Sequence, residues 1–227
     1  MTIRVAILDD HISIIDGYLY RLSKNPEIEV VATETYGEAL DSMLAEHSPD
    51  VLILDLNVPT SPVNRNIFPI MAIVPQLLER TPGLNILIIS MFNQHTLIEA
   101  MADAGVSGYI LKNDQESIEQ LGKIVQNISG GGFYFSPEAY RDSSKIPGVP
   151  TLTNRQLQAL SLCATYPNEA TVSLAHIMDV SGSTLRNLLS GAYLRLGVRT
   201  RAAAIDKARQ LGYLPALEQF QAQEIPK

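Results

Sequence analysis

Cysteine is almost absent from the 227-residue sequence: Cys163 stands alone, so the chain cannot form an internal disulfide, and no Cys/His spacing resembles a zinc site. Long apolar runs are absent too, since nowhere do about 18 consecutive apolar residues occur, the length that spans a bilayer. The opening MTIRVAILDD reaches two acids before a cleavable apolar segment could form. We therefore expect a cytoplasmic protein that does not associate with membranes.

Positive charge is scarce and unevenly distributed. Residues 1–150 carry 9 Lys and Arg against 19 Asp and Glu, a net charge of −10, whereas residues 151–214 carry 7 against 3, a net charge of +4. The overall charge is −7, and 46% of residues are hydrophobic, which is too much apolar content for a disordered chain. The asymmetry indicates two domains with different partners, the basic one being the candidate for binding a polyanion.

The first 130 residues alternate short apolar runs with helical patterns, which is typical of βαβ units around a parallel sheet. Several runs are continuously apolar, as expected for strands buried on both faces. Five such units indicate a flavodoxin-like fold. The predicted strands are Ile3–Leu8, Ile28–Ala32, Val51–Leu54, Asn85–Ile89 and Gly108–Leu111, and the predicted helices are Ser13–Ser23, Tyr36–Glu46, Phe68–Glu79, Thr96–Ala104 and Gln115–Ile128.

Beyond residue 150 the strand patterns stop. Residues 131–150, rich in Gly and Pro, are interpreted as a linker. Residues 151–214 are predicted to form a small all-α domain of four helices, and residues 215–227 a C-terminal tail. The predicted helices are Asn154–Ala164, Ser173–Met178, Gly182–Leu196 and Arg201–Leu211.

Polar residues follow four of the five predicted strands: Asp9 and Asp10, Asp55, Ser90 and Lys112. The carboxyl ends of parallel strands share one sheet edge, so these side chains should converge there. Clustered carboxylates repel one another unless a cation is present, and Mg²⁺ with oxygen ligands is the expected one. Metal, ammonium and hydroxyl all directed at Asp55 would stabilise a phosphoryl group, with Asp55 as the nucleophile.

The strings ILDDHISIIDG (7–17), VLILDLNVP (51–59), IISM (88–91) and GYILKN (108–113) resemble the receiver domain of two-component response regulators. The resemblance implies that Asp55 accepts a phosphoryl group from a cognate sensor histidine kinase. It also implies that Asp10 and Asp55 ligate Mg²⁺ directly. Asn57 would contribute its main-chain carbonyl, Asp9 would act through water, Ser90 and Tyr109 would be the switch pair, and Lys112 would contact the phosphoryl oxygens.

The loop after the acceptor departs from the family pattern. The segment TSPVNRNIFPIMAIVP, Thr60–Pro75, is several residues longer than usual and lacks the glycine that the family places about four residues after the equivalent of Pro59. Such a loop could cover the site, form a contact of its own, or be a neutral surface insertion. The residues alone leave these alternatives open.

The segment from Thr151 to about Leu211 resembles the LuxR-type helix-turn-helix of NarL/FixJ regulators. Ser181 or Ser183 would cap its second helix, and the leucines of that helix would mark its buried side. In the major groove, Arg186 and Asn187 would contact base edges or phosphates, and Thr184 with the helix amino terminus would bind phosphate. The predicted DNA-binding residues are Thr184, Arg186, Asn187, Ser190, Arg195, Arg199 and Arg201.

We therefore expect a bacterial response regulator, not an enzyme, in which phosphorylation of Asp55 with Mg²⁺ controls dimerisation and binding to promoter DNA, with RNA polymerase as a further partner. A phosphotransferase or phosphatase with an aspartyl intermediate is disfavoured, because such enzymes generally need a second acid where Asn57 stands. An atypical regulator that works unphosphorylated through protein contacts is the remaining alternative. The long loop and a helix with few cations favour it, and the complete acidic set argues against it.

Overall fold

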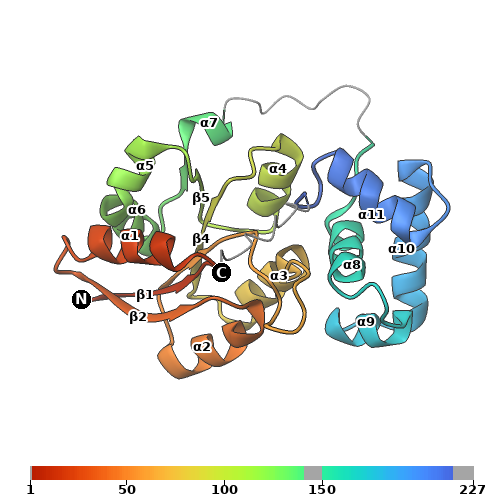
Figure 1. Ribbon diagram of the computed structural model, residues 1–227, viewed down its shortest axis with the longest axis horizontal. Coiled ribbons are helices and arrows are strands. Elements are labelled where there is room, and N and C mark those ends of the chain that lie inside the picture. The colour runs from red at the N-terminus through yellow and green to blue at the C-terminus, as the bar shows by residue number, and fades with distance from the viewer. Residues whose placement is uncertain (1, 141–149, 217–227) are drawn as a thin grey trace, which may run out of the picture.

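The computed structural model describes residues 2–140 and 150–216, which form an α/β domain and an all-helical domain lying side by side (Figure 1). The α/β domain contains one parallel six-stranded sheet in the order β2-β1-β3-β4-β5-β6. The strands are β1 (Ile3–Leu8), β2 (Ile28–Glu34), β3 (Val51–Leu54), β4 (Asn85–Ser90), β5 (Gly108–Leu111) and β6 (Tyr134–Phe135).

Alternate side chains of β1 face opposite layers of helices. Val5 and Ile7 pack with α1 and α6, whereas Ala6 and Leu8 pack with α2, α3 and α4. Because β1, β3 and β4 are covered on both sides, their runs are continuously apolar. The helices are α1 (Ile12–Leu22), η1 (Gly37–Ala39), α2 (Leu40–His47), α3 (Ile70–Arg80), α4 (His95–Asp103), α5 (Gln115–Glu119), α6 (Leu121–Ser129) and α7 (Pro137–Tyr140).

The α/β domain extends into residues that the sequence places in a linker. β6 pairs in parallel with β5, and α7 follows it. Gly108 permits this close pairing, because a Cβ there would lie 2.6 Å from the carbonyl oxygen of Tyr134. Residues 131–140 therefore belong with the sheet, and 141–149 lie outside the described residues.

The helical domain consists of α8 (Asn154–Thr165), α9 (Thr171–Ile177), α10 (Gly182–Leu196) and α11 (Arg201–Gln210). Three of these helices begin at a side-chain cap: Thr153 forms a capping box with Gln156, and Ser181 and Thr200 accept hydrogen bonds from the first turns of α10 and α11. Ser181 is therefore the residue that caps α10. Cys163 is fully buried inside this domain.

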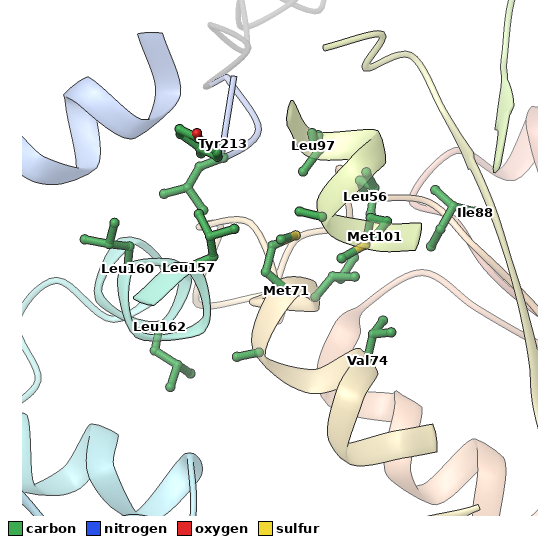
Figure 2. Close-up of a cluster of buried hydrophobic side chains, with 14 of the residues drawn as sticks. Leu56, Met71, Val74, Ile88, Leu97, Met101, Leu157, Leu160, Leu162 and Tyr213 are labelled. Atoms are coloured by element: carbon green, nitrogen blue, oxygen red, sulfur yellow. The ribbon is translucent and has the colours of Figure 1, made fainter. Parts of the chain in front are cut away.

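One apolar cluster runs from the sheet into the helical domain (Figure 2). Met71 of α3 projects between Leu97 of α4 and Leu157 of α8. The two domains therefore share an apolar contact and are not merely tethered. Among the described residues, no helix combines the length and apolar character needed to cross a membrane.

Candidate functional site

The residues of the predicted acidic edge lie where β1, β3 and β5 end. Lys112 extends its ammonium between two carboxylates, with Nζ 2.7 Å from Oδ2 of Asp9 and 2.9 Å from Oδ2 of Asp55. Asp9 and Asp55 are 1% and 3% exposed, so these charges are almost fully removed from water. Asp10 lies at the rim of the same edge, with a side chain that is 11% exposed.

Charge at this edge is unbalanced, since Asp9 and Asp55 face a single ammonium. Burial and then repulsion from Asp9 raise the pKa of Asp55 above its ordinary value, although Lys112 and the backbone N–H of Asn57 oppose the shift. Burial alone would lower the pKa of Lys112, but the two carboxylates outweigh it and raise that pKa. An additional cation at this edge would relieve the excess negative charge.

Two observations fit a hard divalent cation here. Oδ1 of Asp55 is buried without a hydrogen-bond partner, which is costly for a carboxylate oxygen and leaves it available as a ligand. Asp9, Asp10 and His11 also offer ligand atoms that all lie within 4.8 Å of one another. This oxygen-rich donor set is of the kind that Mg²⁺ prefers.

Tyr109 is fully buried, and its hydroxyl donates to the carbonyl oxygen of Phe92 at 2.6 Å. Ser90 is also fully buried at the end of β4, where its hydroxyl oxygen accepts from the N–H of Phe92 at 3.3 Å. Burial raises the pKa of Tyr109, and a hydrogen bond with Ser90 opposes this rise. Ser90 and Tyr109, the predicted switch pair, thus both form hydrogen bonds with the backbone of Phe92.

In the helical domain, α10 presents an exposed polar stripe while Leu185, Leu189, Ala192 and Leu196 face the core. Six of the predicted DNA-binding residues are exposed: Thr184, Arg186, Asn187, Ser190 and Arg195 on α10, and Arg199 just after it. Leu194 lies on the same stripe and is 83% exposed. This accessible surface is the part of α10 on which the predicted DNA contacts depend.

Two of the predicted DNA-binding cations make bonds within the helical domain. Arg195 donates to the carbonyl oxygen of Thr151 at 2.6 Å. Arg201 donates to the carbonyl oxygen of Glu169 at 2.9 Å and to Oγ1 of Thr171 at 3.2 Å. Arg186 and Arg199, which also belong to the predicted set, are exposed, and within the described residues they form no hydrogen bond of this kind.

A family model for the response regulator receiver domain matches residues 5–124, more than half of the chain. The chain is a response regulator of the NarL/FixJ type. The fold agrees with that assignment, because a parallel receiver sheet is followed by the helical domain.

Two similar curated proteins align with this chain over nearly their whole length. The transcriptional regulatory protein DegU of Brevibacillus brevis is 25% identical, with 93% of this chain and 95% of DegU covered. The oxygen regulatory protein NreC of Staphylococcus epidermidis is 28% identical, covering 90% of this chain and 96% of NreC. Both of these relatives are named as regulatory proteins.

Solved structures of the response regulator RcsB from Salmonella typhimurium share the fold. One, described as showing conformational dynamism for DNA interaction, has a TM-score of 0.62 at 21% identity and covers 92% of this chain and 98% of its own. Another is RcsB bound to a promoter in the presence of a beryllofluoride phosphomimetic, with a TM-score of 0.59 at 22% identity, covering 91% and 98%.

Two residues near the acidic edge of this response regulator were not predicted as part of it. His11 places Nδ1 2.7 Å from Oδ1 of Asp10, and its position directly after two acids was a signal that sequence reasoning could have used. Tyr18 of α1 is buried nearby, and burial followed by the charges of Asp9 and Asp55 raises its pKa. Tyr18 is far from Asp55 along the chain, so no local pattern marks it as a neighbour of the acidic edge.

Proposed function

We propose that this response regulator is phosphorylated on Asp55 by a sensor histidine kinase in a Mg²⁺-dependent reaction. Phosphorylation then controls dimerisation and the binding of the helical domain to promoter DNA in the cytoplasm. The observation that carries the proposal is the convergence of Asp55, Asp9 and Lys112 within 3 Å contacts at the acidic sheet edge. A dianionic group attached to Asp55 would meet an ammonium already in place.

Mg²⁺ is the cofactor that this edge fits. Asp10 and Asp55 would hold it directly, with the main-chain carbonyl of Asn57, and Asp9 would act through water. The unpartnered Oδ1 of Asp55 supports this assignment. The bound ion would neutralise charge on the transferring phosphoryl group. The chain's own part is to present Asp55 as nucleophile and to hold Lys112 beside it.

Ser90 and Tyr109 would transmit the change. A phosphoryl group adds about −1.5 to −2 charges near pH 7. The Lys112 ammonium and the Ser90 hydroxyl would move toward this anionic group. Because Ser90 and Tyr109 both contact Phe92, movement of one is coupled to the other through a buried turn. Leu56, next to Asp55, lines the gap between the two domains, which gives a second short route to the helical domain.

The helical domain would bind duplex DNA through α10. Arg186, Asn187 and Ser190 lie on its exposed stripe and would reach base edges or phosphates, while Thr184 and Arg199 would contact the backbone. The net charge of +4 on residues 151–214 supports a polyanionic ligand. The relative DegU is named a transcriptional regulatory protein, which favours promoter DNA as that ligand. A homodimer is the proposed binding form, because a structure with the same fold is described as RcsB dimers bound to DNA.

Intact-mass measurement after incubation with a small-molecule phosphoryl donor tests the first step. We expect the wild type to gain one phosphoryl mass with Mg²⁺ and none with a chelator. Asp55→Asn should gain none, and Asp10→Asn should react at least tenfold more slowly. Asp41→Asn, which changes an exposed acid, is the matched control. A phosphoryl gain by Asp55→Asn, or no gain by the wild type, would refute the proposed acceptor.

An atypical regulator that acts unphosphorylated is the second candidate. The observation that favours it is the long loop after Asp55, whose Asn66 donates a hydrogen bond to the carbonyl oxygen of Thr165 in the helical domain at 2.9 Å. Band shifts on genomic fragments, with and without beryllofluoride and Mg²⁺, separate the two. Equal binding under both conditions would support the alternative.

A further inference from the structure

Three helices of the helical domain end against the receiver, and each end meets a receiver side chain that donates a hydrogen bond. The last carbonyl groups of an α-helix have no partner within the helix and carry the negative end of its dipole. Asn66, Gln76 and Thr96 supply donors to the carboxyl ends of α8, α9 and α11 respectively.

The contact at α8 is reciprocal. Nδ2 of Asn66 donates to the carbonyl oxygen of Thr165, the last residue of α8, at 2.9 Å. In return, the Thr165 hydroxyl donates to the carbonyl oxygen of Ile67 at 2.6 Å. Thr165 is only 2% exposed, so a lost partner here would leave a polar group away from water.

The other two contacts follow the same pattern from different receiver helices. Nε2 of Gln76, on α3, donates to the carbonyl oxygen of Ile177, where α9 ends, at 2.9 Å. The hydroxyl of Thr96, on α4, lies 2.7 Å from the carbonyl oxygen of Gly212 and 3.1 Å from that of Leu211, just beyond α11. The three donors are neutral, so the contacts do not depend on a titrating group.

The long loop after Asp55 is built to hold Asn66 in place. Pro59 and Ile67 form an antiparallel bridge, and the backbone N–H of Thr60 donates to the carbonyl oxygen of Asn66 at 2.9 Å. The hairpin also rests on Gly37, where a Cβ would overlap the ring of Phe68. A braced hairpin presents its amide with little loss of conformational entropy on contact.

Docking in this orientation leaves α10 uncovered. Arg186, Asn187 and Ser190 are all exposed with both described domains present, and the receiver contacts α8 and α11 (Figure 1). The receiver therefore binds the side of the helical domain that the exposed stripe of α10 does not use.

We propose that Asn66, Gln76 and Thr96 form an intramolecular docking surface whose role is to cap the carboxyl ends of α8, α9 and α11. The occupant is the helical domain of the same chain. The surface holds that domain against the α3–α4 side of the receiver in an orientation that keeps α10 free to bind DNA. The extra length of the loop after Asp55 is the feature that supplies the first of the three caps.

Thiol labelling of a buried interface position measures the undocked population. Ser161, on α8, lines the gap between the domains and is 6% exposed, so Ser161→Cys should react only when the domains separate. Cys163, fully buried within the helical domain, reports unfolding of that domain in the same molecule. We expect Asn66→Ala, Gln76→Ala or Thr96→Val to raise the labelling rate at position 161 about fivefold each, which corresponds to about 1 kcal/mol.

The Asn66→Ala and Thr96→Val pair should raise that rate about 25-fold, because the two residues lie on different elements and act independently. Labelling of Cys163 should not change. Asn168→Ala and Thr81→Val, at exposed positions, are the matched controls and should label like the wild type. Unchanged labelling at position 161 in the double variant, or a parallel rise at Cys163, would overturn the docking surface.

A second measurement tests whether the docked form leaves α10 free, and this part rests on the proposed function. Asp103 and Asn154 line a second gap between the domains, of about 200 Å³, so cysteines placed there can be joined by a short bismaleimide. The joined protein should bind a non-specific duplex at low salt within about twofold of the unjoined one. Loss of binding only on joining would overturn the proposed orientation. Absence of binding in both forms would instead refute the DNA-binding function, while the labelling rates still decide the docking surface.

Discussion

The two domains of this response regulator place their functional groups in opposite environments. In the receiver, Asp9, Asp55 and Lys112 are withdrawn from water and partnered at 2.7–2.9 Å. In the helical domain, Arg186, Asn187 and Ser190 stand in solvent on α10. A buried charge acts strongly on its neighbours, whereas an exposed one contributes little until a ligand removes water from it.

This difference changes what a substitution tests. At the acidic edge a single change alters the pKa and the stability of the whole cluster, so effects on folding and on function must be separated. On α10 a change leaves the fold intact and reports on the ligand. The predictions below exploit this contrast, from the largest expected effect to the smallest.

Replacing Lys112 should have the largest effect on stability. Lys112→Ala leaves two buried carboxylates facing each other, and breaking a buried pair in this way costs about 3–5 kcal/mol of unfolding free energy. Urea unfolding without Mg²⁺ measures it, and added Mg²⁺ should restore part of the loss. Lys123→Ala, at an exposed position, should change little. A Lys112→Ala protein as stable as the wild type would mean that the edge is not electrostatically strained.

The arginines of the helical domain should separate into two classes. Arg186→Ala should weaken duplex binding by about 1–3 kcal/mol, because it removes a contact on the exposed stripe. Arg201→Gln should instead lower stability by about 1 kcal/mol, because its guanidinium bonds to oxygens of Glu169 and Thr171. Fluorescence anisotropy with labelled DNA and thermal melts of both variants check the assignment. It is wrong if Arg201→Gln loses more affinity than Arg186→Ala.

Asp55→Asn should stabilise the protein near neutral pH. Burial raises the pKa of Asp55, so its ionisation is unfavourable in the folded state, and the cost builds up as pH rises from the unfolded-state pKa through the folded-state pKa. Below the unfolded-state pKa the carboxyl is protonated in both states, and the stabilities of the two proteins should converge. We expect the melting temperature of Asp55→Asn to exceed that of the wild type at pH 7, with each kcal/mol gained corresponding to about 2–4 °C for a chain of this size. A gain that grew on acidification would contradict the sign. Asp41→Asn serves as the exposed control.

The salt dependence of DNA binding should be modest. If only Arg186 and Arg199 of each protomer meet phosphates, a dimer neutralises about four, and log K should fall with log salt at a slope near −4. Participation of Arg195 and Arg201 as well would steepen the slope to about −7. Titrations between low and moderate salt distinguish these values, and a slope near −7 would mean that Arg195 and Arg201 leave their internal partners on binding.

Much of the fold was predictable because its signals are local. The apolar runs at Ile3–Leu8, Val51–Leu54 and Gly108–Leu111 became strands with the predicted bounds, and α10 spans Gly182–Leu196 as expected. β6 was missed because two residues are too short for a strand pattern, and only pairing with β5 defines it. The predicted helix Gln115–Ile128 is divided at Gln120, where the backbone leaves the helical region.

The sequence by itself determined the acidic edge, because the chain order of a parallel sheet brings the residues after β1, β3 and β5 to one place whatever the details of packing. Tertiary structure alone decided which cations of the helical domain are engaged internally and where the long loop makes its contact. Asn66 and Thr165 meet across 99 residues of chain, and neither has a local pattern that names the other. A helix end attracts any suitable donor, so its partner is set by how the domains pack and not by the sequence around it.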